Sequence, residues 1–194
     1  MVFLYLSGFK RSGKDTFCSD IINNNISKWL IYSKSYTEQI FNDFLNKSWK
    51  RMSFADKLKM MVRNKYFPLY TLDFLEMHKD DKIFNGKSFR DYCISYSKTK
   101  DKNYWIESCM KNININENYI VTDWRFPHEY YYMLKKGIKP YTFRIFRDVD
   151  IPEEENEHLL DDFIADFLVI NKKCNIGDAV KIFPQYKDYI LTLD

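Results

Sequence analysis

The most constraining feature of this chain is a glycine-bounded loop near the N-terminus, residues 8–16, with the sequence GFKRSGKDT and the spacing GxxxxGK. It follows a short apolar run, Val2–Leu6, which is typical of a buried strand. Behind it, Phe17 and Ile21 recur at helical spacing. We call residues 8–16 the phosphate loop, because a strand, a loop of this spacing and a helix together predict a site for phosphate groups.

The residue types of the phosphate loop explain why it suits an anion. Gly8 permits a sharp exit from the strand, and Gly13 lets main-chain amides approach phosphate oxygens without an intervening side chain. The helix starting near Asp15 directs unpaired N–H groups at the same anion, and Lys14 adds an ammonium. Two of the chain's five glycines fall in this loop, which disfavours the alternative of a lysine-rich surface turn.

The position after Lys14 departs from the usual pattern. It holds Asp15, where a phosphate loop ordinarily has the Ser or Thr that binds magnesium, and Thr16 follows one residue later. Magnesium is therefore expected on Asp15 or on a water. The alternative for Thr16 is a bond to the α-phosphate.

Composition excludes several classes of protein. The 194 residues suit one domain, 45% of them are hydrophobic, and no apolar run approaches the roughly 18 residues of a membrane span. A formal charge of +3 is too small to indicate a nucleic-acid binder by itself. Four cysteines without a CxxC pair and three scattered histidines predict neither a disulfide scaffold nor a zinc site. The N-terminus does not resemble a signal peptide. The widely separated cysteines favour a reducing cytosol, so a cytoplasmic protein is expected.

The hydrophobic pattern predicts strands alternating with helices over residues 1–194, without a domain boundary. Strands are expected at 2–6, 52–54, 119–123, 141–146 and 167–170. Helices are expected at 15–23, 31–47, 55–65, 88–97, 103–112 and 127–136, with a polar excursion at 69–87. This alternation predicts an α/β fold with a mostly parallel sheet covered by helices on both faces. Ligands of such sheets bind at the carboxyl ends of the strands.

Several segments resemble one family of kinases. Residues 3–16 (FLYLSGFKRSGKDT) closely resemble the phosphate loop of the phage-type deoxynucleoside monophosphate kinases, and similar words occur in the animal-type phosphomevalonate kinases. Residues 53–59 (SFADKLK) look like the start of the family's acceptor-binding helix, and residues 121–129 (VTDWRFPHE) resemble its turn after a strand. Residues 157–161 (EHLLD) and 166–171 (DFLVIN) are similar to its final stretch.

The resemblance implies a three-layer P-loop NTPase fold of the nucleoside monophosphate kinase type, with ATP and Mg²⁺ as cofactors. The implied reaction is transfer of the γ-phosphoryl group of ATP to a phosphate monoester. The sequence of residues 123–129, DWRFPHE, is more similar to that of the nucleotide kinases, since the phosphomevalonate kinases tend to carry DTRR at this place. Residues 24–50 and 69–87 match nothing in the family.

The resemblance assigns one set of residues to the nucleotide. Lys14 bridges the transferred phosphate, Arg11 lies on the ATP side, and Arg147 borders a lid at about 147–160. The nucleotide-binding residues implied are Gly8, Arg11, Ser12, Gly13, Lys14, Asp15, Thr16 and Asn171. The catalytic residues implied are Lys14, Arg11, Arg90 and Arg147, and the magnesium ligands are Asp15 and Asp123.

A second set is assigned to the acceptor, on a helical region at about 55–115 and on the turn after a strand. Its members are Lys10, Asp56, Lys57, Arg90, Trp105, Asp123, Arg125 and Glu129. Each has a plainer alternative from its residue type alone. The basic residues are ordinary surface charges, the turn at 123–129 is an ion pair that caps a helix, Trp105 is a core aromatic, and Asn171 forms a turn. His128 and His158 receive no role.

The expected partner is a deoxynucleoside monophosphate, with no membrane and no specific nucleic acid, and a homodimer is left open. Two rival hypotheses remain. The first is the same transfer to phosphomevalonate or another small monoester. The second is a P-loop ATPase or nucleotide switch that binds nucleic acid, which the slight net charge and the lack of a basic–aromatic stripe in the sequence disfavour.

Overall fold

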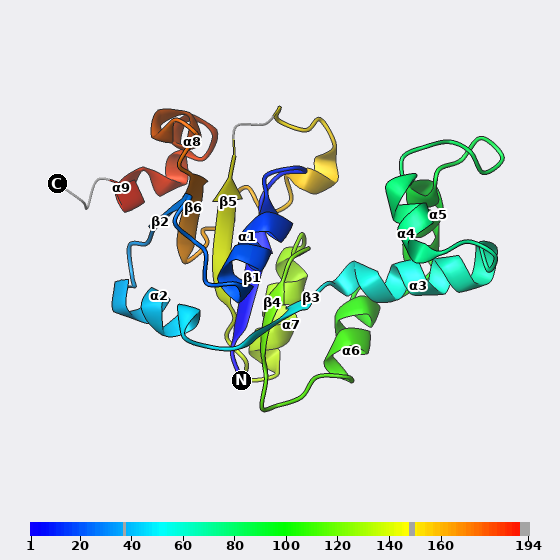
Figure 1. Ribbon diagram of the computed structural model, residues 1–194, viewed down its shortest axis with the longest axis horizontal. Coiled ribbons are helices and arrows are strands. Elements are labelled where there is room, and N and C mark those ends of the chain that lie inside the picture. Colours follow the sequence, from blue (N-terminus) through cyan, green and yellow to red (C-terminus); the bar gives the residue numbers. More distant parts are fainter. Residues whose placement is uncertain (37, 148–149, 191–194) are drawn as a thin grey trace. The chain divides into compact units, whose positions relative to one another are not determined.

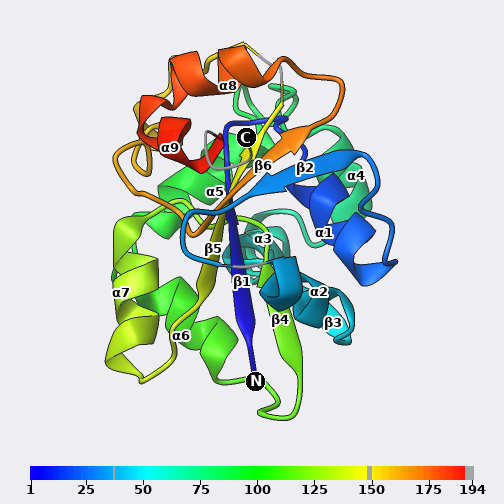
Figure 2. The ribbon, with the colours of Figure 1, turned by 90° about the vertical axis from the view of Figure 1, so that its left-hand side faces the viewer.

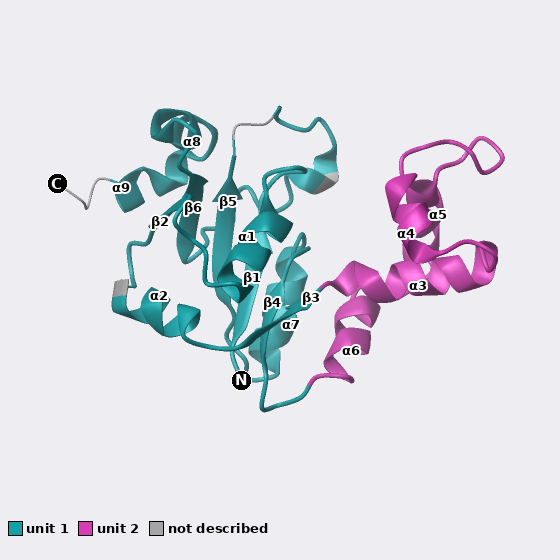
Figure 3. Cartoon of the chain, in the orientation of Figure 1, with its two compact units in different colours: residues 1–52, 114–194 teal, residues 53–113 magenta. Residues whose placement is uncertain are grey.

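A computed structural model describes residues 1–36, 38–147 and 150–190, apart from the side chains of Glu38 and Asn156. Its contacts divide the chain into two compact units (Figure 3). Unit 1 comprises residues 1–52 and 114–194, and unit 2 comprises residues 53–113. The sequence indicated a helical region at about 55–115 inside one domain, because no Gly- or Pro-rich linker stands at either junction.

Unit 1 is built on one six-stranded sheet in the order β2-β6-β5-β1-β4-β3 (Figure 1). The strand pairs are parallel except β2 with β6, which is antiparallel. The strands are β1 Phe3–Ser7, β2 Trp29–Tyr32, β3 Trp49–Met52, β4 Asn118–Val121, β5 Tyr141–Phe146 and β6 Phe167–Asn171. The expected α/β class with a mostly parallel sheet is confirmed.

Helices cover both faces of this sheet (Figure 2). The helices and 3₁₀ turns of unit 1 are α1 Lys14–Ile22, α2 Glu38–Leu45, α7 Pro127–Lys135, η1 Glu155–Glu157, α8 Ile176–Ile182, η2 Pro184–Tyr186 and α9 Lys187–Ile190. Strand alternation decides the two cores. Phe167 and Val169 of β6 pack with α1 and α2. Leu168 and Ile170 pack with α8, η2 and α9 on the opposite face.

Two expectations for unit 1 need correction. The segment expected as one helix over 31–47 contains strand β2 followed by α2. Residues 29–32 (WLIY) pair with β6, and this partner lies far along the chain, at Asn171 for Trp29. The strand expected at 52–54 lies at Trp49–Met52 instead, because Ser53 occupies the position before the next helix.

Unit 2 is helical, with α3 Phe54–Tyr66, α4 Leu72–Met77, α5 Phe89–Ser97 and α6 Tyr104–Met110. Its core includes Val62, Phe67, Leu75 and Phe89. The polar excursion expected at 69–87 therefore contains a helix, α4, whose first turn is capped by Thr71: the Phe74 amide donates to its hydroxyl at 3.2 Å. Across the described parts of both units, no helix has the length and apolarity needed to cross a bilayer.

Candidate functional site

The phosphate loop connects β1 to α1 through a main chain that needs its glycines. Gly8 has φ of 145°, Arg11 of 67° and Gly13 of 94°, three residues in the left-handed half of conformational space. A Cβ atom on Gly8 would lie 2.5 Å from the carbonyl oxygen of Ile145. The Ser12 amide donates to the carbonyl of Phe9 at 3.0 Å, which tightens the turn.

The start of α1 directs donors into this loop. The Phe17 amide donates to the carbonyl of Gly13 at 2.8 Å, so the amides of Lys14, Asp15 and Thr16 precede the first bond of the helix. The buried hydroxyl of Ser12 has no hydrogen-bond partner within the described residues. A concave set of main-chain amides beside a helix start is suited to an anion.

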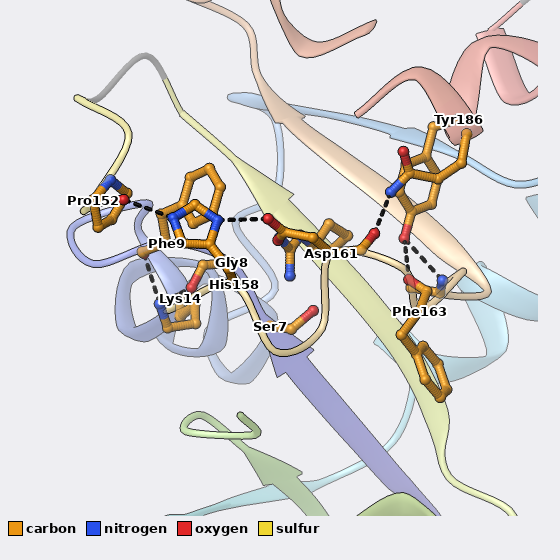
Figure 4. A network of polar contacts seen from close by, with 12 residues as sticks. Ser7, Gly8, Phe9, Lys14, Pro152, His158, Asp161, Phe163 and Tyr186 are labelled. Carbon is orange, nitrogen blue, oxygen red and sulfur yellow. Dashed lines mark hydrogen bonds and ion pairs between the residues drawn. The ribbon is translucent and has the colours of Figure 1, made fainter. Parts of the chain in front are cut away.

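Lys14 folds back over the loop that precedes it (Figure 4). Its Nζ donates to the carbonyl oxygen of Gly8 at 2.6 Å and to that of Phe9 at 2.8 Å. Burial, together with the positive charge of Arg125, lowers the pKa of Lys14 to about 8, although the negative charge of Glu157 opposes the shift. The ammonium is therefore poorly compensated, which favours an additional anion nearby.

A small pocket lies beside Gly8 at the carboxyl ends of the neighbouring parallel strands. We call it the Gly8 pocket; it is lined by Gly8, Trp124, Arg125, Arg144, Glu157 and Leu160. Arg144 pairs in register with Ser7 across β5 and β1, which places it next to the glycine. Arg125 follows β4, the other neighbour of β1. Three adjacent strands thus deliver the loop and two guanidinium groups to one place.

Both arginines of the Gly8 pocket are held by carboxylates of the segment 155–161. Arg125 Nη1 lies 2.6 Å from Glu157 Oε1, and the Glu157 side chain is only 7% exposed. Arg144 donates through Nη2 to Asp161 Oδ1, while its guanidinium stacks over the ring of Phe183 at 4.4 Å. Burial lowers the pKa of Arg144. Its side chain is 2% exposed, and its Nε has no hydrogen-bond partner in the described part of the chain.

His158 joins this group through both of its ring nitrogens (Figure 4). Nδ1 lies 2.6 Å from Asp161 Oδ2, and Nε2 lies 2.6 Å from the carbonyl oxygen of Pro152. These two hydrogen bonds raise the pKa of His158. The imidazole also packs 5.2 Å from the ring of Phe9, so it connects the segment 152–161 with the phosphate loop.

The Asp161 turn is fixed from its other side. Gln185 Nε2 donates to the Asp161 carbonyl oxygen at 2.6 Å. The Tyr186 hydroxyl accepts from the Ala165 amide at 2.8 Å and donates to the carbonyl of Phe163 at 3.3 Å (Figure 4). The carboxylate that holds Arg144 and His158 is therefore anchored to η2.

The turn after β4 has two kinds of acidic residue. Glu129 Oε2 accepts from the amides of Arg125 at 3.2 Å and Phe126 at 3.1 Å, so it caps the start of α7. Burial, and then the charge of Asp123, raise the pKa of Glu129 to about 8. The structure thus gives Glu129, predicted to bind the acceptor, a structural role at the helix start. Asp123 is half-buried at the end of the strand, and Arg125 lines the Gly8 pocket.

The remaining phosphate-loop residues differ in exposure. Lys10 is half-buried, whereas Arg11, Asp15 and Thr16 are exposed. Asp15 Oδ1 lies 3.5 Å from Arg51 Nε. No group of three or more His, Cys, Asp or Glu side chains suited to a metal occurs among the described residues.

Two nucleotide-side predictions fall at strand ends. Asn171 closes β6, and its Oδ1 accepts from the Lys173 amide at 3.1 Å, as the turn alternative expected. Arg147 is exposed directly after β5. The lid expected at about 147–160 includes residues 148 and 149, which lie outside the described residues. The described remainder holds η1 and the contacts of Glu157 and His158 given above.

Four predicted acceptor residues belong to unit 2. Lys57 is exposed and Asp56 is half-buried in the first turn of α3. Arg90 forms a two-point contact with Asp80, with Nε 2.5 Å from Oδ1 and Nη2 3.5 Å from Oδ2. Trp105 is half-buried, with its ring centroid 4.9 Å from that of Tyr104.

Unit 2 also contains lysine–tyrosine contacts that the sequence pattern did not reveal. Lys65 lies over the rings of Tyr66 and Tyr96, and Lys100 lies over Tyr96 and Tyr104. Residues 53–113 hold twelve Lys or Arg against eight Asp or Glu, whereas unit 1 holds eighteen against nineteen. The basic surplus of the chain is therefore confined to unit 2. The packing of α3 against α5 brings Lys65 onto the ring of Tyr96, which no continuous stretch of sequence could show.

Sequence reasoning missed Arg144, Glu157, His158 and Asp161. His158 received no role, and Arg144 lay inside the strand expected at 141–146 without a role of its own. A signal existed in the spacing of Glu157, His158 and Asp161, three polar residues within five positions beside an apolar strand.

Neither a family model nor a curated protein matches the chain.

Proposed function

We infer that the chain is an ATP-dependent kinase that phosphorylates deoxynucleoside monophosphates. The observation that carries this inference is the phosphate loop. It joins a buried parallel strand to a helix, has left-handed main-chain conformations at Gly8 and Gly13, and lies beside Lys14, Arg125 and Arg144. Phosphoryl transfer depends on position and on positive charge around the moving group, and this set of residues supplies both.

The residues present suit a nucleoside triphosphate with magnesium. The amides at the start of α1 and the unpartnered Ser12 hydroxyl offer donors for phosphate oxygens. Magnesium at such sites takes most of its ligands from phosphates and water and needs only one or two carboxylates, so Asp15 or Asp123 suffices. The bound ion would neutralise charge on the β- and γ-phosphates.

The acceptor needs no catalytic base. A phosphate monoester has a second pKa of about 6 and is largely dianionic near neutral pH, so it is already a nucleophile. Within unit 1 we assign the acceptor to Lys10, Asp123 and Arg125. The residues of unit 2 that the family resemblance names for an acceptor are Asp56, Lys57, Arg90 and Trp105.

The direct test is ADP release by the purified protein with Mg²⁺, ATP and a panel of acceptors. We expect turnover with a deoxynucleoside monophosphate and loss of turnover by orders of magnitude in Lys14→Ala. Lys181→Ala, which removes a 79% exposed lysine paired with Asp178, is the matched control and should retain full activity. Turnover with phosphomevalonate alone would move the reaction to the rival acceptor, and unchanged turnover in Lys14→Ala would refute the proposed site.

One observation favours the second rival function, nucleic-acid binding. Residues 53–113 have lysines close to tyrosine rings and a surplus of four positive charges. Proteins bind single-stranded nucleic acid with basic and aromatic side chains of this kind. Fluorescence anisotropy with a labelled oligonucleotide tests it. Nucleic-acid binding would be favoured over the kinase by two results together. The protein would bind the oligonucleotide tightly and in a salt-dependent way, with binding abolished in the double variant Lys65→Glu, Lys100→Glu. It would also show no acceptor-dependent ADP release.

A further inference from the structure

The Gly8 pocket carries an excess of positive charge that the residues around it do not balance. Four cationic groups lie at or next to this pocket. Arg125 and Arg144 line it, Lys14 bonds to its lining residue Gly8, and His158 bonds to Asp161, the partner of Arg144. Glu157 and Asp161 supply two negative charges. With His158 protonated, two positive charges remain, which is the charge that a phosphate dianion would balance.

One cation of the pocket still has a free donor. Arg144 is almost fully buried, yet its Nε has no partner in the described part of the chain, although a buried donor left unpaired is destabilising. Asp161 Oδ1 takes only the Nη2 side of the guanidinium. An unpaired buried donor on a charged group lining a pocket points to an anionic ligand that completes its bonds.

The protonation of His158 controls how Asp161 is shared. Both ring nitrogens face oxygen acceptors, Asp161 Oδ2 and the carbonyl of Pro152, and only the imidazolium donates to both. A neutral ring would lose one of these bonds and would leave the Asp161 charge to Arg144 alone. The positive excess at the pocket would then fall from two to one.

The other charged groups that face this cluster do not replace His158. Lys14 of α1, Arg125 of the turn after β4, Arg144 of β5 and Glu157 of η1 are counted above. Asp15 also faces Lys14, but its carboxylate lies at the outer side with Arg51. The neighbour of His158 on the phosphate loop is the uncharged ring of Phe9.

We propose that the Gly8 pocket is a subsite for a tetrahedral dianion and that binding of the dianion is coupled to protonation of His158. Arg144 and Arg125 touch the ligand, and His158 is a positioning residue that acts through Asp161. The proposal rests on the proposed function in so far as the dianion is a phosphate of ATP or of the acceptor. Anion binding should therefore weaken as the pH rises through the pKa of His158.

Sulfate is the probe of choice, because it stays dianionic across the whole pH range in which histidine titrates. We expect calorimetric titration of the full chain to show sulfate binding at least about fivefold tighter at pH 6 than at pH 7.5, within the usual range of coupling between two sites. The bound proton should appear as a heat that varies with the ionisation enthalpy of the buffer. Lys14, whose pKa is about 8, stays mostly protonated over this window.

The variant His158→Gln should bind sulfate equally at both pH values, with the weaker affinity of the wild type at pH 7.5. His128→Gln, on α7, is the matched control and should keep the wild-type pH dependence. An NMR titration of the wild type supplies a readout that does not depend on a variant: the pKa of His158 should rise when sulfate is added. No sulfate binding at pH 6, or a pH dependence that survives His158→Gln, would overturn the proposal.

Competition identifies the source of the natural dianion. Loss of sulfate binding with a deoxynucleoside monophosphate, but not with ATP, assigns the subsite to the acceptor, and the reverse assigns it to the donor. The two proposals fail separately. Proton-coupled sulfate binding without any kinase activity leaves the subsite intact, whereas kinase activity with pH-independent sulfate binding removes only the coupling.

Discussion

The ammonium of Lys14 lies 2.6 Å from the carbonyl oxygen of Gly8, so the lysine of the phosphate loop closes the loop onto its own first residue. A second bond, to the carbonyl of Phe9 at 2.8 Å, holds it there. Carbonyl oxygens carry only partial negative charge, and they compensate a buried ammonium less well than a phosphate would. The two hydrogen bonds therefore hold the ammonium of Lys14 against the carbonyl groups at the start of the loop.

Replacing Gly8 by alanine should destabilise the protein by about 2–3 kcal/mol. The added Cβ would meet the Ile145 carbonyl at 2.5 Å and the Ser12 hydroxyl at 2.6 Å, at a φ of 145° that alanine avoids. Urea unfolding measures the change. Gly86→Ala is the control, since its φ is also positive but its Cβ would meet nothing within 4 Å, and about 1 kcal/mol is expected there. Equal losses in the two variants would contradict the steric argument.

Anion binding at the phosphate loop should weaken above about pH 8. Burial lowers the pKa of Lys14 to about 8, so its ammonium is mostly charged at pH 7 and loses its proton as the pH rises through 8. Titration of the wild type with ATP from pH 7 to 9.5 should show this loss. In Lys14→Arg the guanidinium stays charged throughout, so the decline should disappear even if binding is weaker overall. A decline that is identical in both proteins would assign the titration to another group.

The ion pair between Arg125 and Glu157 should be strongly coupled. Glu157 is 7% exposed, so Arg125→Ala leaves a nearly buried carboxylate without its partner, at a cost of about 2–4 kcal/mol. Glu157→Gln added to Arg125→Ala should recover most of that loss, because the unpaired charge is then gone. A double-mutant cycle by thermal or urea unfolding measures the coupling energy.

The exposed pair of Lys181 and Asp178 is the reference for that cycle, with a coupling of about 0.5 kcal/mol or less expected. If the Arg125–Glu157 coupling is no larger than this reference, the pair is merely a surface contact. Glu157 would then not hold Arg125 at the Gly8 pocket.

Glu129→Gln should become more stabilising as the pH rises from 5 to 8. The folded-state pKa of Glu129 is raised to about 8, so the stability that its retained proton contributes is complete at low pH and is lost as the pH approaches 8. Glutamine keeps an oxygen for the amides of Arg125 and Phe126 but has no charge to bury. We expect the variant to gain about 3 kcal/mol on the wild type over this range.

Unfolding free energies at pH 5, 6.5 and 8 provide the measurement for Glu129. Glu107→Gln, an exposed residue in the first turn of α6, should leave the pH dependence of the wild type unchanged. Glu129→Ala should lose about 1 kcal/mol or more at every pH, because it removes the cap of α7. A Glu129→Gln effect that is flat with pH would show that the carboxyl titrates normally.

The phosphate loop illustrates what could be predicted from the sequence. Its glycines, its lysine and the apolar run before it lie within sixteen consecutive residues, and their conformations depend mainly on near neighbours. Strands β4, β5 and β6 were foreseen for the same reason, since each is a short apolar run. Strand β2 was not, because WLIY at 29–32 is equally compatible with a helix until β6 is present to pair with it.

By itself, the sequence determined the α/β class and the position of a loop suited to phosphate, because short-range periodicity and glycine placement decide both. Only the tertiary structure decided which charges accompany that loop. Arg125, Arg144 and Asp161 come from three separate segments, and strand order alone places β4 and β5 on either side of β1. Burial then sets which of these groups remain charged, and that depends on every element packed around them.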